Sequence, residues 1–379
     1  MAFTSATLRF APPLPRRRRS SFSRRHCLSI SNSGVAQHDH AYLRHRSTPG
    51  EYAPTNLTLK HACSDHYPLD LFQAVLSFGR DGKELRRREQ NTVAGEKDDE
   101  EEDGVEMSVI LPESEETVAN IFSALGKPDD DPHWADVWHG GIALNEYLVL
   151  ADVAHGGGGG SLVRGKRVLE LGCGVGLTGV LCAMEGAKKV TMTDREPFAC
   201  YCAVASAIAN GFGTVTKALD EDASVVDGLA QMDVGLLENV VDRSSRSRQK
   251  CECVEAKIMD WFKLDEYLKK EDDFAYDVVI ACDCLYCEEA VEAVASIVFE
   301  AFSRGRRRQQ EQDVSSPFTF LLADPPSRFP QNHAKFLEIM QEKSGVNDVK
   351  RKDTLLAVRN PCQEDEGEIV VKICEYTFR

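Results

Sequence analysis

The sequence lacks any run of about eighteen consecutive apolar residues, the length that a helix needs to cross a bilayer. Its first 50 residues also lack a continuous apolar segment, which argues against a secretory signal. We therefore expect no association with a membrane. The thirteen cysteines are an odd number, and several stand inside expected strands and helices, which indicates a reducing compartment rather than a disulfide framework.

Lysine is absent from the first 50 residues, and acid is almost absent. Nine arginines and eight serines stand there against a single acid, Asp39. Such a composition is typical of an organelle transit peptide, and we expect residues 1–50 to be a disordered presequence. We expect a chloroplast protein, with a mitochondrial one as the alternative. A basic arm that binds nucleic acid, on a protein that stays in the cytoplasm, is a further possibility.

The whole chain carries a net charge of −16, so that residues 51–379 carry −24. Because residues 51–379 are acidic, they should repel the phosphate backbone of a nucleic acid. We therefore expect the folded domain to bind no nucleic acid. Its partner should be basic, such as a protein segment with an accessible lysine, and we expect the chain itself to be a monomer.

Two segments show little apolar pattern. Residues 51–107 end in the acid run 97–103, and we expect them to be poorly ordered, so that regular structure begins at residue 108. We interpret residues 211–250 as an insertion at the rim of a domain that spans 108–379.

The segment Lys166–Gly176 reads Lys-Arg-Val-Leu-Glu-Leu-Gly-Cys-Gly-Val-Gly, a short buried strand and a glycine-rich turn that opens a helix. Eighteen residues after Gly176, a second strand ends in Asp194. This spacing is typical of the first β-α-β unit of a nucleotide-binding doubly wound sheet. Because glycine has no Cβ, the backbone amides of this turn can touch a ligand. Asp194 can accept hydrogen bonds from the hydroxyls of a ribose.

Two frames fit these glycines. From Gly174 to Gly179 the chain reads Gly-x-Gly-x-x-Gly, a dinucleotide fingerprint with Asp194 twenty residues on. From Glu170 it reads Glu-x-Gly-x-Gly-x-Gly, the first motif of S-adenosylmethionine-dependent methyltransferases. Inside a strand buried on both faces, an unpaired Glu170 would be costly. At the strand's end it can fix the loop and face a cationic cofactor, so the second frame is favoured and the first stays open.

The remaining pattern predicts an α/β fold, with a seven-stranded, doubly wound, Rossmann-like sheet between two layers of helices. Residues 353–358 and 369–378 should form an antiparallel hairpin at the sheet edge. We interpret residues 304–312 as an exposed basic loop. Further strands are expected near 108–111, 253–259, 276–283 and 318–323, and helices near 114–125, 140–149, 196–209, 288–302 and 331–343.

Four motifs follow one another at successive strand ends over residues 133–326. They are Asp136-Val-Trp-His-Gly-Gly, Glu170–Gly176, Asp260-Trp261 and Asp283-Cys-Leu-Tyr286. With these motifs in this order, the chain resembles the seven-β-strand protein-lysine methyltransferases. This group includes the valosin-containing-protein, Hsp70 and electron-transfer-flavoprotein lysine methyltransferases. The last motif corresponds to that group's Asp-x-x-Tyr. The presequence, the 211–250 insertion and His139-Gly-Gly depart from the group's pattern.

The resemblance implies S-adenosyl-L-methionine as cofactor and a lysine side chain of a protein as substrate, with no metal. It makes Asp283 the group that positions the lysine and can accept its proton, and it places Tyr286 in the lysine channel. The cofactor-binding residues that it implies are Trp138, Glu170, Gly172, Gly174, Gly176, Asp194, Asp260, Trp261 and Cys282.

Simpler interpretations remain for some of these residues. Trp261 could be a core tryptophan, and Asp283 could cap the helix that begins at Glu288. Trp134 is expected only to pack. Cys284 and Cys287 have the spacing of a metal or redox pair, but the chain has no second pair at the spacing of a zinc ribbon. For the chain as a whole, a small-molecule N-methyltransferase, a nicotinamide-dependent oxidoreductase and a non-catalytic scaffold are the alternatives.

Overall fold

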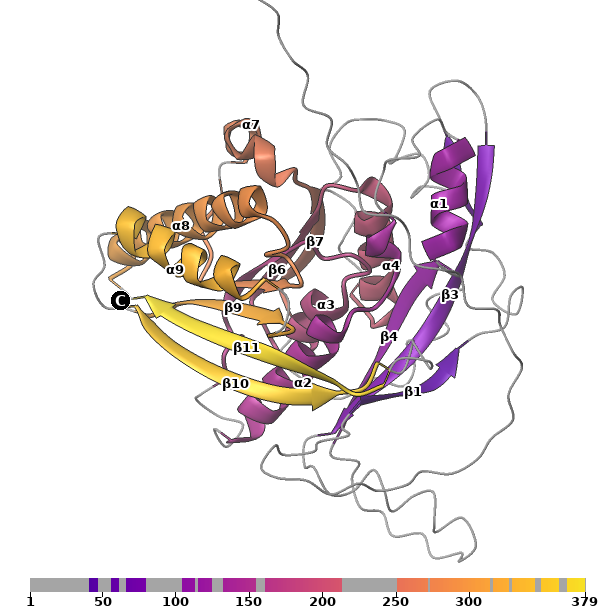
Figure 1. The fold of residues 1–379 in the computed structure, drawn as a ribbon, viewed down its shortest axis with the longest axis horizontal. Coiled ribbons are helices and arrows are strands. Elements are labelled where there is room, and N and C mark those ends of the chain that lie inside the picture. Colours follow the sequence, from indigo (N-terminus) through magenta and orange to yellow (C-terminus); the bar gives the residue numbers. More distant parts are fainter. Residues whose placement is uncertain are drawn as a thin grey trace, which may run out of the picture. The chain divides into compact units, whose positions relative to one another are not determined.

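The computed structural model shows two sheets and the helices that pack on them (Figure 1). It describes residues 41–46, 56–60, 66–79, 104–112, 115–124, 132–154, 161–212, 251–271, 273–313, 316–326, 329–344, 349–360 and 367–378. The acid run 97–103 and most of the presequence and of the 211–250 insertion lie outside these residues.

The larger sheet has seven strands in the order β10-β11-β9-β8-β5-β6-β7. The five strands from β9 to β7 are parallel, whereas β11 runs antiparallel to both of its neighbours. This confirms the predicted Rossmann-like sheet with a C-terminal antiparallel hairpin. The strands are β5 (Arg167–Leu171), β6 (Lys189–Asp194), β7 (Cys253–Ile258), β8 (Val278–Cys282), β9 (Phe318–Asp324), β10 (Lys350–Val358) and β11 (Ile369–Phe378).

The central strands are buried on both faces because neighbouring side chains point to opposite sides of the sheet. Val168 belongs to one hydrophobic core and Leu169 to the other, and Ile280 and Ala281 divide in the same way. The first core contains α2 (His139–Ala154), α3 (Leu177–Met184) and α4 (Pro197–Ala209). The second contains α8 (Glu288–Glu311) and α9 (Pro330–Ser344), with the short α7 (Leu264–Lys270) against it.

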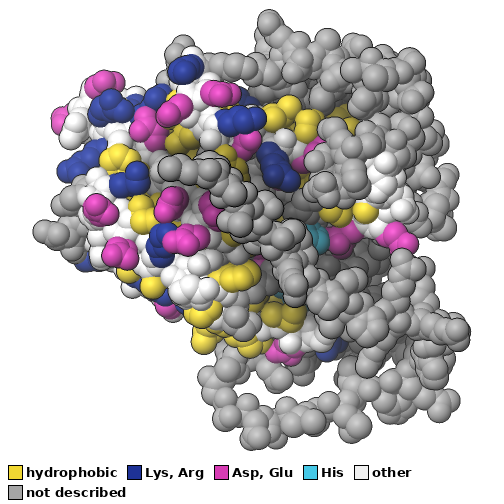
Figure 2. Space-filling view, turned by 45° about the horizontal axis from the view of Figure 1, so that its top comes forward, with side chains coloured by type: hydrophobic (Ala, Val, Ile, Leu, Met, Phe, Trp, Pro, Cys, Tyr) yellow, Lys and Arg dark blue, Asp and Glu magenta, His cyan; other side chains and the backbone are white. Residues whose placement is uncertain are grey.

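Outside the cores, the surface is charged and mixed. On the face drawn in Figure 2, acidic and basic side chains are interspersed and hydrophobic ones reach the surface between them. Among the described helices, none is both long and apolar enough to cross a bilayer.

A second, four-stranded sheet precedes this domain in the chain, where we expected little order. It comprises β1 (Ala41–Arg46), β2 (Asn56–Lys60), β3 (His66–Gly79) and β4 (Gly104–Pro112), and β3 pairs with the other three. The expectation that regular structure begins at residue 108 is therefore wrong, and β1 lies within the expected presequence. Every second residue of β3 from Ala74 to Phe78 is buried, and this two-residue period is the pattern that sequence reasoning missed.

The second sheet is held against α4 by hydrogen bonds. The side-chain amide of Asn210 accepts the N–H of Ser108 at 2.9 Å and donates to its carbonyl at 2.6 Å. The hydroxyl of Ser206 accepts the N–H of Ile110 at 2.8 Å. The short helix α1 (Glu115–Ala124) follows β4, within one residue of the predicted bounds 114–125 at each end.

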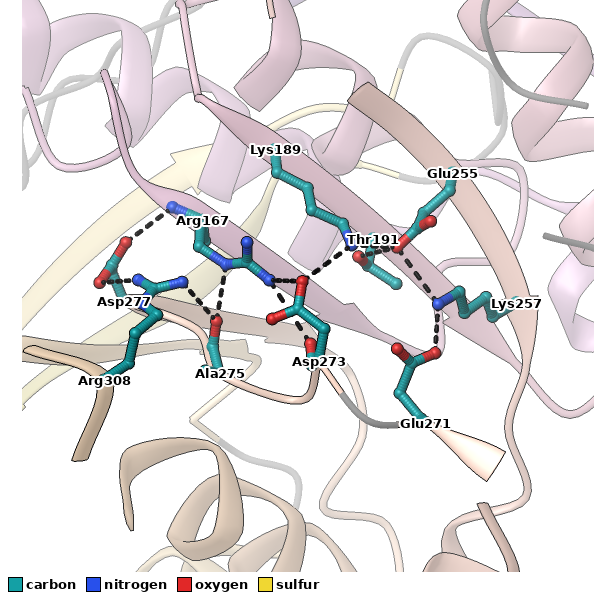
Figure 3. Close-up of polar contacts among 10 residues, drawn as sticks. All are labelled: Arg167, Lys189, Thr191, Glu255, Lys257, Glu271, Asp273, Ala275, Asp277 and Arg308. Atoms are coloured by element: carbon teal, nitrogen blue, oxygen red, sulfur yellow. Dashed lines mark hydrogen bonds and ion pairs between the residues drawn. The ribbon is translucent and has the colours of Figure 1, made fainter. Parts of the chain in front are cut away.

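Residues 304–312 do not form the expected loop, because α8 continues to Glu311. Gly305 lies so close to Tyr276 that any Cβ would overlap the Tyr276 carbonyl. One turn later, the Arg308 guanidinium contacts the Asp277 carboxylate at 3.0 Å and the Ala275 carbonyl at 3.1 Å (Figure 3). These contacts with the segment before β8 explain why a strongly polar stretch stays helical.

Further ion pairs begin at the amino ends of β5 and β6 (Figure 3). Arg167, the first residue of β5, pairs with Asp273 at 2.5 Å, and Lys189, the first residue of β6, pairs with Glu255 at 2.8 Å. Lys257 links Glu255 to Glu271. The pairs of Arg167 and Lys189 therefore brace the amino ends of β5 and β6, whereas Lys257 extends the network along β7 toward its carboxyl end.

Candidate functional site

The predicted site residues stand at the carboxyl ends of adjacent parallel strands. Glu170 lies near the end of β5, Asp194 ends β6, Asp260 follows β7, and Cys282 ends β8 with Asp283 after it. Because these strands are neighbours, their ends lie along one edge of the sheet, which is where doubly wound folds bind ligands. A cavity of 680 Å³ lies elsewhere, beside the end of α8 at Phe302 and Gln309, and contains none of these residues.

The glycine turn has the backbone that glycine alone adopts easily. Gly172, Gly174 and Gly176 have φ values of 63°, 49° and 81°, all in the left-handed region. A Cβ on Gly176 would lie 2.7 Å from the Cβ of Ala203 on α4. The turn is therefore tight because α4 packs directly against it, and the N–H groups of Cys173, Gly174 and Gly176 donate to acceptors within the protein.

Glu170 anchors the helix that follows this turn. Its Oε2 accepts the N–H of Gly179, in the first turn of α3, at 3.0 Å. Burial raises the pKa of Glu170 to about 8, and the charge of Asp194 adds to this, whereas the Gly179 N–H opposes it. The loop-fixing role predicted for Glu170 matches this contact. A nearby cation would stabilise the charged form of its carboxyl group.

Asp194 holds the glycine turn from the neighbouring strand. Its Oδ2 accepts the N–H of Gly174 at 3.0 Å and its Oδ1 accepts the N–H of Glu196 at 3.0 Å. Burial raises its pKa, while these two N–H groups oppose the rise. Two buried carboxyl groups thus stand beside the turn, and a carboxylate has lone pairs left for a diol. The contact with ribose stays a prediction.

The indole of Trp261, in the segment after β7, lies against Gly172 of the glycine turn. Asp260 accepts the N–H of Phe262 at 3.0 Å and so caps the 3-10 helix η3 (Trp261–Lys263). A Cβ on Gly172 would lie 3.1 Å from the indole Cζ2 of Trp261. Trp261 is only partly buried, so it borders the turn rather than filling the core.

The aromatic loop before α2 closes the turn on a third side. In the 3-10 helix η1 (His133–Ala135), the Trp134 carbonyl would lie 3.1 Å from a Cβ on Gly174. Trp134 packs against Phe198, with ring centroids 6.4 Å apart, as expected of a packing residue. Trp138 donates its indole N–H to the His133 carbonyl at 2.7 Å, so the loop is folded on itself beside the turn.

Asp283 is held at the N-terminus of α2. Its Oδ2 accepts the N–H of Gly140 at 3.1 Å, and its own N–H donates to the Ala323 carbonyl at 2.9 Å. It has a φ of 53°, which is unusual for a residue with a side chain and occurs often at functional sites. Any Cβ at Gly140 would overlap the Asp283 carboxylate, so glycine is required there.

The interpretation of Asp283 as the cap of α8 is wrong. Cys287 is the N-cap, and its Sγ accepts the N–H of Ala290 at 3.4 Å. Cys284 is buried, and the cysteine pair thus has a packing and capping role. In the described ranges, no group of three His, Cys, Asp or Glu side chains is placed to hold a metal ion.

Tyr286 and the loop before it are fixed by α9. The side-chain amide of Asn332, itself buried, donates to the Leu285 carbonyl at 2.8 Å. The ring of Tyr286 lies 6.5 Å from that of Trp261 and is half exposed. Asn332 was missed by sequence reasoning, since it lies 47 residues from Leu285 and belongs to no local motif.

Two further side chains complete this edge. The Cys282 Sγ lies 4.0 Å from the Thr178 Oγ1 of α3. Asp324, at the end of β9, lies 3.4 Å from the Nε2 of His333. Burial lowers the pKa of His333 to about 4, so the imidazole is neutral near pH 7 and this contact is not an ion pair.

The comparisons with known proteins agree with this geometry. Residues 133–218 match the model of a family described as lysine methyltransferase. This range contains the aromatic loop, the glycine turn, Glu170 and Asp194, so the resemblance that the motifs indicated is confirmed.

Two relatives show how far the similarity extends. The mouse electron transfer flavoprotein beta subunit lysine methyltransferase is 38% identical over 93 residues, which are 24% of this chain and 33% of that protein. The protein N-lysine methyltransferase METTL21A of Danio rerio is 26% identical over 215 residues, 57% of this chain and 70% of that protein. The matched part thus spans a third of the length of the mouse relative.

Among solved structures, the magnesium protoporphyrin IX methyltransferase of Synechocystis is similar at a TM-score of 0.35 and 15% identity, over 70% of this chain and 99% of that one.

Proposed function

We propose that this chain is an S-adenosylmethionine-dependent methyltransferase that modifies a lysine side chain of a protein. The observation that carries the proposal is the Asp283–Tyr286 loop, held beside a glycine turn whose two buried carboxyl groups favour a cation. The family match over residues 133–218 and the names of the relatives support it.

The residues around the turn fit the cofactor. Because they have no Cβ, Gly172 leaves space beside the Trp261 indole and Gly174 leaves space beside the Trp134 carbonyl. Glu170 and Asp194 are buried carboxyl groups beside that space, and the positive sulfonium of the cofactor would favour their charged forms. Asp194 would hold the ribose and Trp261 would cover the adenine.

When bound, S-adenosylmethionine supplies an activated methyl group, whose bond to sulfur breaks with its electron pair left on sulfur as the lysine nitrogen bonds to carbon. The protein must align these three atoms and exclude water. A lysine ammonium has an ordinary pKa of about 10.4 and must lose a proton before it can react. Burial beside the sulfonium lowers that pKa.

Asp283 would position the amine and receive its proton. The N–H of Gly140 fixes one carboxylate oxygen, and the helix N-terminus behind it interacts favourably with negative charge. The strained backbone of Asp283 points to a side chain held for a task rather than for packing. Tyr286 would line the path of the lysine side chain with its ring.

We further propose that the protein acts in an organelle, in the first place the chloroplast, since residues 1–50 are rich in arginine and serine and poor in acid. Import of a fluorescent fusion of residues 1–50 would test this. A fusion that stays in the cytosol would contradict it.

Calorimetry would test the cofactor and methylation would test the substrate. We expect the full chain to bind S-adenosylhomocysteine tightly and NADH not at all. With a labelled methyl donor and an organelle extract, label should appear on a lysine of a protein band, and Asp283→Asn should abolish it. Label found only on small molecules would favour the N-methyltransferase of a metabolite. Tight NADH binding without S-adenosylhomocysteine binding would overturn the proposal in favour of an oxidoreductase.

A further inference from the structure

Large hydrophobic side chains are exposed at only a few described positions, and most of these border the candidate site. Phe262 is 55% exposed, Tyr286 49% and Phe329 41%. They follow β7, β8 and β9, three strands whose carboxyl ends form the edge that carries the site. The other exposed ones, Leu355 and Val370, lie on β10 and β11.

Contacts of the backbone and of neighbouring side chains join the three aromatic residues into one rim. Phe262 is fixed by its N–H bond to Asp260, and its neighbour Trp261 lies 6.5 Å from Tyr286, ring to ring. On the other side, Asn332 binds the Leu285 carbonyl through its side chain and the Phe329 carbonyl through its own N–H, at 2.8 and 2.9 Å. Asn332 therefore ties Phe329 to the loop that carries Tyr286.

The position of Phe329 is costly for an isolated protein. Its φ of 44° is in the left-handed region, which a bulky side chain rarely adopts. Yet its ring remains 41% exposed, so packing inside the protein does not explain the strain. Exposed aromatic side chains held in fixed positions are the usual anchors of a protein interface.

The charges around the rim set the kind of partner. Exposed acids follow Phe262 at Asp265 and Glu266, and follow Tyr286 at Glu288 and Glu289. Exposed lysines are fewer there: Lys263 pairs with Asp260, and Lys269 lies on the same helix as Asp265 and Glu266. The half-buried Lys335 pairs with Glu288. The rim is thus aromatic with an excess of negative charge, which complements a segment that is both apolar and basic.

We propose that Phe262, Tyr286 and Phe329 form a docking rim for the polypeptide that flanks the target lysine. The proposal rests on the function proposed above. Bulky apolar side chains next to the lysine contact the rings, while further basic residues lie near the acids. The enzyme therefore selects lysines with apolar neighbours over lysines in polar segments.

Two labelled peptides of equal length and charge test this rim by fluorescence anisotropy, in the presence of S-adenosylhomocysteine. Both carry a central lysine, which is flanked by leucine and phenylalanine in one and by serine and glycine in the other. The wild-type chain should bind the apolar-flanked peptide about tenfold more tightly. Phe262→Ala and Phe329→Ala should each remove most of this preference. Leu355→Ala, which removes an equally exposed side chain from β10, should leave it unchanged.

Equal binding of the two peptides by the wild-type chain, or an undiminished preference in both rim variants, would overturn the proposal. Because binding is measured without chemistry, the test does not depend on activity. Calorimetry with S-adenosylhomocysteine would show that each variant keeps its fold. If the binding preference is present but neither peptide accepts a methyl group, the proposed reaction fails and the docking rim stands.

Discussion

Two buried carboxyl groups beside the glycine turn set the electrostatics of the candidate site. Burial raises the pKa of Glu170 to about 8, and it raises the pKa of Asp194 as well. A cation placed beside Glu170 would favour its charged form and lower that pKa. A positively charged ligand bound beside the turn should therefore change the protonation of the site.

We expect S-adenosylmethionine, which is cationic at sulfur, to displace a proton from Glu170 when it binds near pH 7. Calorimetry in buffers of different ionisation enthalpy would measure this release, and affinity should rise as the pH approaches 8. S-adenosylhomocysteine, which lacks the positive sulfur, is the matched control and should release fewer protons. Equal proton release by both ligands would contradict the role given to Glu170.

The same group links stability to pH. Its pKa is higher in the folded protein than in the unfolded chain, so its contribution to stability is fully present below about pH 4.5. This contribution is lost as the pH rises through about 8. Glu170→Gln keeps an acceptor for the Gly179 N–H but cannot ionise. Urea unfolding at pH 6 and pH 8.5 should therefore show a larger loss of stability for the wild-type chain than for this variant.

Gly140 controls the position of Asp283, because a Cβ there would overlap the carboxylate. Gly140→Ala should lower kcat by up to about a hundredfold, the cost of a displacement of roughly 1 Å in a reacting group. S-adenosylhomocysteine affinity should be little changed. Gly141→Ala is the matched control, since its Cβ would meet only side-chain atoms, of Leu177 at 3.2 Å and of Thr178 at 3.8 Å. Similar kcat values for the two variants would argue against Asp283 as the positioning group.

At the residue scale, the sequence was informative where the backbone dictates the residue. The three glycines with positive φ were predictable because few other residues form such a turn, and Glu170 was predictable from its place at the strand end. The contact of Gly140 with Asp283 and that of Asn332 with Leu285 were not, since each joins residues that are distant in the chain. Such contacts depend on the packing of α2 and α9 on the strand ends.

At the scale of elements, the seven strands of the main sheet and most helices lie where the apolar pattern predicts them. The pattern failed where composition obscured it. The arginine-rich end of α8 was taken for a loop because its helical face consists of Gly305 and Arg308 rather than apolar residues. The alternation in β3 was overlooked, although Leu76 and Phe78 are fully buried.

Arg308 stabilises the end of α8 through Asp277 and the Ala275 carbonyl. Arg308→Ala should lower the free energy of unfolding by about 1–2 kcal/mol, because the buried carboxylate of Asp277 loses its hydrogen bond from a charged partner. Arg307 is exposed on the same helix, and Arg307→Ala should change it by less than about 0.5 kcal/mol. Chemical denaturation would measure both, and equal values for the two variants would show that the α8 contact adds nothing.

The N-terminal sheet should be required for stability. A chain that begins at residue 104 keeps β4 but loses β3, and with it the buried side chains of Ala74, Leu76 and Phe78. We expect a lower Tm and binding of an apolar dye. A chain that begins at residue 41 keeps all four strands and should have the Tm of the full chain. Equal Tm values for both shortened chains would show that the main domain folds without the second sheet.

At the scale of the whole molecule, the two edges of the main sheet have different tasks. Ion pairs such as Arg167–Asp273 and Lys189–Glu255 lock the edge at the amino ends of the strands (Figure 3). The opposite edge carries the glycine turn, the Asp283–Tyr286 loop and the exposed aromatic rim. The net charge of −16 favours encounter with a basic partner. This division is compatible with the proposed transfer of a methyl group to a lysine of a protein.

The most direct measurement of that claim is methyl transfer from labelled S-adenosylmethionine by the full chain, with chloroplast and mitochondrial extracts as substrates and mass spectrometry to locate the label. We expect a protein band whose label sits on a lysine Nζ, and no such band with Asp283→Asn. A wild-type chain that binds S-adenosylmethionine yet labels no lysine in either extract would contradict the account.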